Sequence, residues 1–206
     1  NTDYFDPSTT LEKDEDELFK LWELKVGKKI ILFPGRLTSW KGQEMFLEAI
    51  NKVNIQLGHE AFIAVILGSD QGRDLYKKKL VRLVEQYRLN TQVKFIEHCK
   101  NMPVAYKISN FVVSASIEPE AFGRVSVEAQ SMHRPILASN IGGSKETIID
   151  NKTGILFEAG NSEDMARKII ELFNLDESTL NQMGIEGRKN VINKFNVEKM
   201  CFSTYS

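Results

Sequence analysis

The run Lys29-Ile30-Ile31-Leu32-Phe33, followed by Pro34-Gly35, is the stretch of sequence that decides the fold. Its continuous β-branched and aromatic character predicts a strand buried on both faces, and Pro-Gly is a turn signal that ends it. A helix is expected next, because apolar residues recur at spacings of three and four from Gln43 to Leu57. A buried strand followed by an amphipathic helix is the repeating unit of a parallel α/β sheet.

The same alternation continues along the rest of the chain. It predicts a helix at 75–87, a short helix through Ala105 and Ile108, a helix around 125–132, and helical structure from Ser162 onward with Ser162 as N-cap. Further strands are expected at 61–67, 93–96, 111–114, 135–138 and 154–157. We therefore predict an α/β domain with a Rossmann-like parallel sheet of about six strands and helices on both faces.

Composition narrows the class of protein. The 206 residues include 27 Lys and Arg against 28 Asp and Glu, a formal net charge of −1, which argues against a sequence-independent nucleic-acid binder. The 42% hydrophobic content suffices for one sizeable core, and no apolar run is long enough to span a membrane. Cys99 and Cys201 are too few for a disulfide framework and lack zinc-site spacing, so we expect a cytoplasmic protein without a metal site.

The loop after the first strand is the first candidate site. It carries Gly35, Arg36, Lys41 and Gly42 where the chain leaves the sheet. In a doubly wound sheet, ligands bind outside the carboxyl ends of the strands, and Arg36 and Lys41 there could clamp a diphosphate. Both could equally be ordinary surface cations, and spacing alone does not separate these interpretations.

The loop after the 111–114 strand is the second candidate site. Glu120 lies before a predicted helix start and Glu128 lies inside that helix, with backbone amides at Phe122, Gly123 and Arg124 between them. Carboxylates accept hydrogen bonds from hydroxyls, and free amides at a helix start bind phosphate. The alternative is that Glu120 only favours the helix dipole and Glu128 is solvated.

Other familiar catalytic patterns are missing from the sequence. It has no P-loop, no Gly-x-Gly-x-x-Gly after the first strand and no evident Ser/His/Asp order, which disfavours a nicotinamide oxidoreductase. His59, His98 and His133 lie on separate segments, and each alone is more often a packing or surface histidine.

Four segments together closely resemble the group 1 (family 4) glycosyltransferases, which are retaining, GT-B-fold enzymes that use nucleotide sugars. The resemblance runs over essentially the whole chain and includes a Glu-x7-Glu element. The segments are Phe33-Pro34-Gly35-Arg36-Leu37 with Lys41-Gly42, Glu120 to Ala129, Gly142 to Glu146, and Thr153 to Leu156.

The resemblance implies a role for each candidate residue. Arg36 and Lys41 would hold the donor diphosphate, Glu120 would hydrogen-bond the donor sugar hydroxyls, and Glu128 would accept from the ribose hydroxyls. The segment from Phe95 to Asn101 would border the base. The remaining donor-binding residues, which approach through their backbone near the phosphates, would be Gly35, Phe122, Gly123, Arg124 and Val125. No metal and no cofactor other than the donor substrate would be needed.

The resemblance also implies a domain organisation. Residues 1–206 would form one donor-binding domain, the C-terminal half of a two-domain enzyme, with 1–26 as linker and lead-in and 196–206 as a helix that crosses back. The charge run at 12–17 is expected to be a solvated helix face or a loop. An N-terminal domain outside this chain would bind an acceptor glycan or glycolipid and could contact the inner face of the cell membrane, for example in lipopolysaccharide or capsule synthesis.

Three departures from the family pattern leave the proposed ligands in place. Ala121 and His133 stand where glycine is common, and Arg124 stands where an aliphatic residue is frequent. Arg124 could add a cation near the phosphates or point into solvent. Alternatives to a transferase are a nucleotide-sugar-binding module without turnover, a nucleotide-sugar epimerase, and a glycogen phosphorylase relative, for which no pyridoxal-phosphate lysine motif is apparent.

Overall fold

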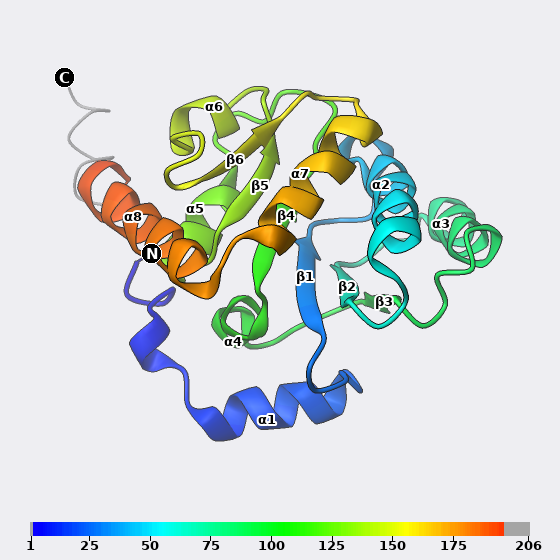
Figure 1. The fold of residues 1–206 in the computed structure, drawn as a ribbon, viewed down its shortest axis with the longest axis horizontal. Helices are drawn as coiled ribbons and strands as arrows, with labels where there is room; N and C mark the ends of the chain where they lie inside the picture. The colour runs from blue at the N-terminus through cyan, green and yellow to red at the C-terminus, as the bar shows by residue number, and fades with distance from the viewer. Residues whose placement is uncertain (1, 196–206) are drawn as a thin grey trace.

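A computed structural model describes residues 2–195, which form one six-stranded, all-parallel sheet in the order β3-β2-β1-β4-β5-β6 (Figure 1). This confirms the predicted α/β class. The strands are β1 (Lys29–Pro34), β2 (Phe62–Leu67), β3 (Val93–Ile96), β4 (Phe111–Ser114), β5 (Ile136–Ser139) and β6 (Gly154–Phe157).

Helices cover both faces of the sheet because successive side chains of each strand point to opposite sides. Ile31 and Phe33 of β1 belong to one apolar cluster, packed mainly by α2 (Gln43–Leu57), α3 (Asp74–Gln86) and α7 (Ser162–Asn174). Ile30 and Leu32 belong to the other cluster. Its helices are α1 (Glu12–Leu21), α4 (Met102–Ile108) and α5 (Arg124–Ser131). The last helix, α8 (Glu177–Lys194), packs along α5 (Figure 1).

Most element boundaries agree with the sequence patterns within one residue, and one predicted cap is wrong. The N-cap of α7 is Asn161 rather than Ser162, because the Asn161 side chain accepts the amides of Glu163 and Asp164, both at 3.0 Å. The sequence patterns did not separate α7 from α8, whose own N-cap is Asp176. They also missed the one-turn helix α6 (Ser144–Thr147).

Residues before β1 are packed against the domain. The charge run lies in α1, as the helix-face interpretation predicted, and α1 packs on α4 with Leu18 and Trp22 buried. Ahead of a 3-10 turn (Pro7–Thr9), Asp6 pairs with Arg188 of α8. The predicted crossover helix at 196–206 lies outside the described residues. No helix between residues 2 and 195 is long and apolar enough to cross a membrane.

Candidate functional site

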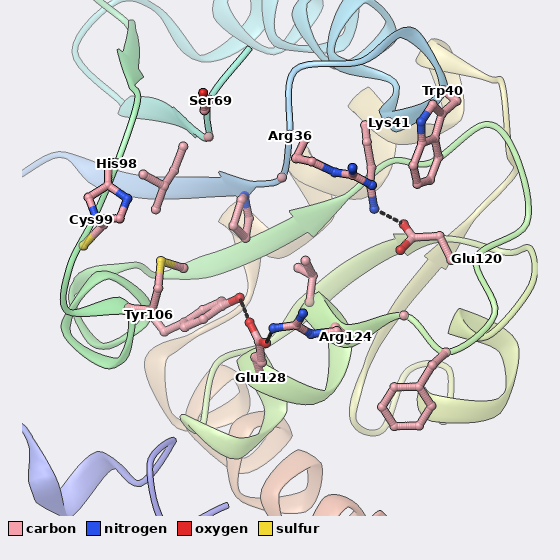
Figure 2. Close-up of a pocket in the computed structure, with 18 of the residues that line it drawn as sticks. Arg36, Trp40, Lys41, Ser69, His98, Cys99, Tyr106, Glu120, Arg124 and Glu128 are labelled. Atoms are coloured by element: carbon pink, nitrogen blue, oxygen red, sulfur yellow. Dashed lines mark hydrogen bonds and ion pairs between the residues drawn. The ribbon is translucent and has the colours of Figure 1, made fainter. Parts of the chain in front are cut away.

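One pocket of about 700 Å³ opens at the carboxyl ends of β1 and β4 (Figure 2). The strand order reverses between these two neighbours, so their outgoing loops diverge and leave a crevice, which is the usual ligand position in open α/β sheets. All nine residues predicted from the sequence line this pocket. They are Gly35, Arg36, Lys41, Glu120, Phe122, Gly123, Arg124, Val125 and Glu128.

The two cations of the loop after β1 have different surroundings. Arg36 is exposed at the rim, and within residues 2–195 its guanidinium forms no ion pair. Lys41, at the end of a 3-10 turn (Ser39–Lys41), has a side chain only 14% exposed. Its Nζ lies 2.7 Å from Oε1 of Glu120 and 4.3 Å from the centre of the Trp40 ring. Lys41 is therefore a held, largely buried cation and not an ordinary surface lysine.

Glu120 lies beside Lys41 in the pocket. Its side chain is 18% exposed, and its Oε1 pairs with the ammonium of Lys41 and accepts a hydrogen bond from the Ser116 hydroxyl. The loop that carries it is tied to the loop after β1 because the amide of Ile117 donates to the Trp40 carbonyl at 2.8 Å. Glu120 thus has fixed partners on the protein side, and the suggestion that it only favours the helix dipole is incomplete.

Two glycines allow these loops to approach one another. At Gly42, φ is +78°, and a Cβ would lie 2.0 Å from the Ala115 carbonyl oxygen. At Gly143, a Cβ would lie 2.5 Å from the carbonyl carbon of Phe122, while the Gly143 amide donates to the Glu120 carbonyl at 2.7 Å. No side chain fits at either position, so the backbone around Phe122 is held directly by the backbone of the next loop.

The ribose end predicted at Glu128 is also preorganised. The Glu128 side chain is only 16% exposed, which contradicts the solvated alternative. Its Oε2 accepts a hydrogen bond from the Tyr106 hydroxyl at 2.8 Å, and its Oε1 accepts one from Nη2 of Arg124 at 3.1 Å (Figure 2). The Arg124 side chain is 83% exposed, so it both pairs with Glu128 and reaches solvent.

Three functional candidates were missed by sequence reasoning: Tyr106, Ser116 as a partner of Glu120, and Ser69 on the pocket wall. Tyr106 is fully buried, and burial, together with the neighbouring Glu128 carboxylate, raises its pKa well above the usual range. It therefore remains a hydrogen-bond donor at ordinary pH. A tyrosine inside an apolar helical stripe was the available signal, since a buried hydroxyl needs a partner.

The opposite end of the pocket is lined by Glu97, His98, Cys99 and Met102. The segment after β3 therefore lines the pocket, and its predicted position beside the base stays a prediction. Cys99 is a free thiol whose pKa is raised by burial, so it is a poor nucleophile at neutral pH. Within residues 2–195, no group of three or more His, Cys, Asp or Glu side chains could hold a metal ion.

Comparison with known protein families identifies the family of this chain. Residues 14–190 match the family model described as "Glycosyl transferases group 1". The chain belongs to the group 1 glycosyl transferases. The predicted family and GT-B-type fold are thereby confirmed.

Three relatives show how much of a group 1 protein this chain represents. It is 32% identical to a glycosyltransferase from Rickettsia africae ESF-5, with a TM-score of 0.93 over 100% of this chain and 53% of that one. It is 29% identical to the Staphylococcus aureus capsular polysaccharide biosynthesis glycosyltransferase CapM over 81% of this chain and 42% of CapM. The solved C-terminal domain of the Francisella tularensis group 1 protein LpcC is 26% identical, with a TM-score of 0.80 over 96% of this chain and 98% of that domain. The chain therefore spans about half the length of the full-length relatives it matches.

Proposed function

We propose that this chain is the donor-binding domain of a retaining glycosyltransferase, which moves a sugar from a nucleoside diphosphate sugar to an acceptor. The observation that carries the proposal is the pocket at the β1 and β4 ends, where two basic side chains, a helix N-terminus and two held carboxylates converge. This set matches the three parts of such a donor, namely a diphosphate, a sugar and a ribose.

The chemistry that this pocket supports is stabilisation of a departing diphosphate. Breaking the bond between the anomeric carbon and the phosphate oxygen leaves positive charge on the sugar and negative charge on the leaving group. Arg36, Lys41 and the amides at the start of α5 would stabilise the negative charge electrostatically. Arg36 is free to bind phosphate, whereas Lys41 must share its charge between Glu120 and the incoming group.

The two carboxylates would then orient the neutral parts of the donor. Glu120 lies beside Lys41 and would accept from the sugar hydroxyls, while Glu128 would accept from the ribose hydroxyls. Glu120 is a positioning group in this mechanism rather than a nucleophile.

The partners of this domain follow from its size relative to the family. Its span of about half of CapM supports an organisation in which a second domain binds an acceptor glycan or glycolipid. The name of CapM supports a role in envelope polysaccharide synthesis. We further propose that the protein works in the cytoplasm, at the inner face of the membrane. The isolated domain would bind the donor without completing transfer.

The experiment that tests the proposal is calorimetric titration of the 206-residue chain with UDP, GDP and ADP and their common sugar conjugates. Saturable binding of one nucleotide is expected, weakened by about tenfold or more in Arg36→Ala and Lys41→Ala because each loses a charge-assisted contact. Lys79→Ala is the matched control, since Lys79 lies on α3 and pairs with Glu44 outside the pocket. If the folded chain binds none of the three nucleotides, the donor-site assignment is wrong. Turnover by the full-length protein separates a transferase from a binding module.

A further inference from the structure

Two side chains donate to the Glu128 carboxylate, and one of them is buried while the other is exposed to solvent. The Tyr106 hydroxyl donates to Oε2 at 2.8 Å from a fully buried ring, whereas Arg124 donates to Oε1 from a side chain that is mostly in solvent. An exposed arginine on a flexible stem fixes a carboxylate poorly. A buried hydroxyl has one position, so Tyr106 sets where the Glu128 carboxylate lies.

The Tyr106 ring is itself immobilised. It lies on α4, whose N-terminus is capped by the side chain of Asn101, and the Phe5 ring packs edge-on against it with centroids 5.8 Å apart. Phe5 is in turn held through its carbonyl, which accepts from Arg188 at 3.0 Å. Rotation of the tyrosine away from Glu128 would break its hydrogen bond to Glu128 and disturb its ring contact with Phe5.

We propose that Tyr106 is a positioning residue that orients the Glu128 carboxylate for the hydroxyls of the donor ribose. An ionised carboxylate offers about four acceptor sites, of which Tyr106 and Arg124 occupy one each. The remaining sites can accept two ribose hydroxyls. This inference rests on the proposed function, and it adds a residue on α4, 22 positions before Glu128, to the donor site.

The test compares each ribonucleotide with its 2′-deoxy counterpart, using UDP, GDP and ADP against dUDP, dGDP and dADP on the whole chain. Wild type is expected to prefer the ribonucleotide that it binds. Tyr106→Phe removes one oxygen and should reduce that preference by about threefold to tenfold, because the carboxylate loses its fixed orientation. Tyr76→Phe is the matched control, since its hydroxyl donates to Gln43 at 3.2 Å outside the pocket.

If Tyr106 only stabilised the fold, Tyr106→Phe would not change the preference for the ribonucleotide. If Tyr106→Phe weakens both nucleotides equally, or changes neither, the positioning role is overturned. Arg124→Ala provides a second variant that cannot unfold the protein through its core. Arg124 also contacts Glu128, but from solvent, so its loss should reduce the ribose preference less than Tyr106→Phe does. A larger reduction in Arg124→Ala than in Tyr106→Phe would also overturn the proposal.

Failure of the proposed function gives a separate signature. If wild type binds no nucleoside diphosphate, the donor site itself is wrong. If wild type binds one and Arg36→Ala weakens the ribonucleotide and its 2′-deoxy form equally, the donor site stands, and the ribose preferences of Tyr106→Phe and Arg124→Ala decide the role of Tyr106.

Discussion

Glu120 and Glu128 are the same residue type eight positions apart, yet the protein holds them in different ways. The main partner of Glu120 is a cation, Lys41, which lies 2.7 Å away on a flexible side chain. The buried partner of Glu128 is the neutral hydroxyl of Tyr106 on a rigid helix. The largely buried partner of one carboxylate is thus a cation, whereas the buried partner of the other is a neutral hydroxyl, with its cation, Arg124, exposed to solvent.

The different partners of Glu120 and Glu128 predict how the two ends of the pocket would respond to a ligand. Lys41 can move its charge from Glu120 to a phosphate, so binding at that end exchanges one charged partner for another. The Tyr106 ring is fully buried, so its hydroxyl keeps Glu128 as its partner. The Glu128 carboxylate is therefore held in position before any ligand binds. Under the proposed function, phosphate binding beside Lys41 would therefore depend on charge balance, whereas ribose binding at Glu128 would depend on geometry.

The largest expected effect concerns the backbone that brings Lys41 close to Glu120. In Gly42→Ala, the new Cβ meets the Ala115 carbonyl at 2.0 Å with φ at +78°, so we expect the free energy of unfolding to fall by about 3 kcal/mol or more. Gly160→Ala is the matched control, because its φ is +81° but nothing lies within 4 Å of the new Cβ. It should cost only about 1 kcal/mol. Urea unfolding measures both, and equal losses would show that crowding at the Ala115 carbonyl is not what requires Gly42.

The fold was largely predictable because buried parallel strands are continuous apolar runs. The predicted strands at 93–96, 111–114 and 154–157 and the helix Gln43–Leu57 match the structure residue for residue. The site was predictable at the level of loops, since side chains that follow strands gather at one edge of a parallel sheet. Thus all nine predicted residues line the same pocket.

Pairings between distant segments could not be predicted. Lys41 contacts Glu120 because β1 and β4 are neighbouring strands. No local sequence pattern predicts this strand order. Tyr106 lies in the short helix predicted through Ala105 and Ile108, and its partner Glu128 lies on another element, so no local pattern joins the two. The predicted N-cap of α7 was wrong for a local reason, because Asn161 and Ser162 are adjacent and both residue types are good N-caps.

The next effect tests the two partners of Glu128 through stability. Tyr106→Phe leaves the largely buried Oε2 without its donor, so we expect the free energy of unfolding to fall by about 1–2 kcal/mol. Arg124→Ala removes a solvent-exposed partner and should cost less than about 0.5 kcal/mol. Thermal or urea unfolding of the two variants provides the comparison. A larger loss from Arg124→Ala would mean that the exposed ion pair, not the buried hydroxyl, stabilises this end.

A smaller effect is expected when the charge of Glu120 is removed. Glu120→Gln releases Lys41 from its ion pair, so the affinity for a plain nucleoside diphosphate should rise by about threefold to fivefold. Glu128→Gln should instead lower that affinity, because it loses an acceptor for the ribose hydroxyls and releases only the solvent-exposed Arg124. Calorimetry at low and high salt measures both variants, and the gain in Glu120→Gln should shrink at high salt. A weaker affinity in Glu120→Gln would refute the charge-exchange description of the phosphate end.

The smallest effect lies at the far end of α5, the helix that carries Glu128. His133 has φ at +55°, and burial, followed by the nearby positive charges of Arg188, Arg134 and Lys107, lowers its pKa below the usual 6.5. The unfolded chain therefore binds more protons between the folded-state pKa and 6.5, and the free energy of unfolding should decrease as pH falls through that window. His133→Gly removes the titrating group and suits the left-handed backbone, so it should change stability at pH 8 by less than about 1 kcal/mol. Urea unfolding between pH 5 and pH 8 should show a shallower pH dependence in this variant than in wild type. An unchanged slope would show that the acid sensitivity in this window comes from groups other than His133. Asp6 is not one of them, because the hydrogen bonds from Ser8 lower its pKa and its contribution is lost only at lower pH.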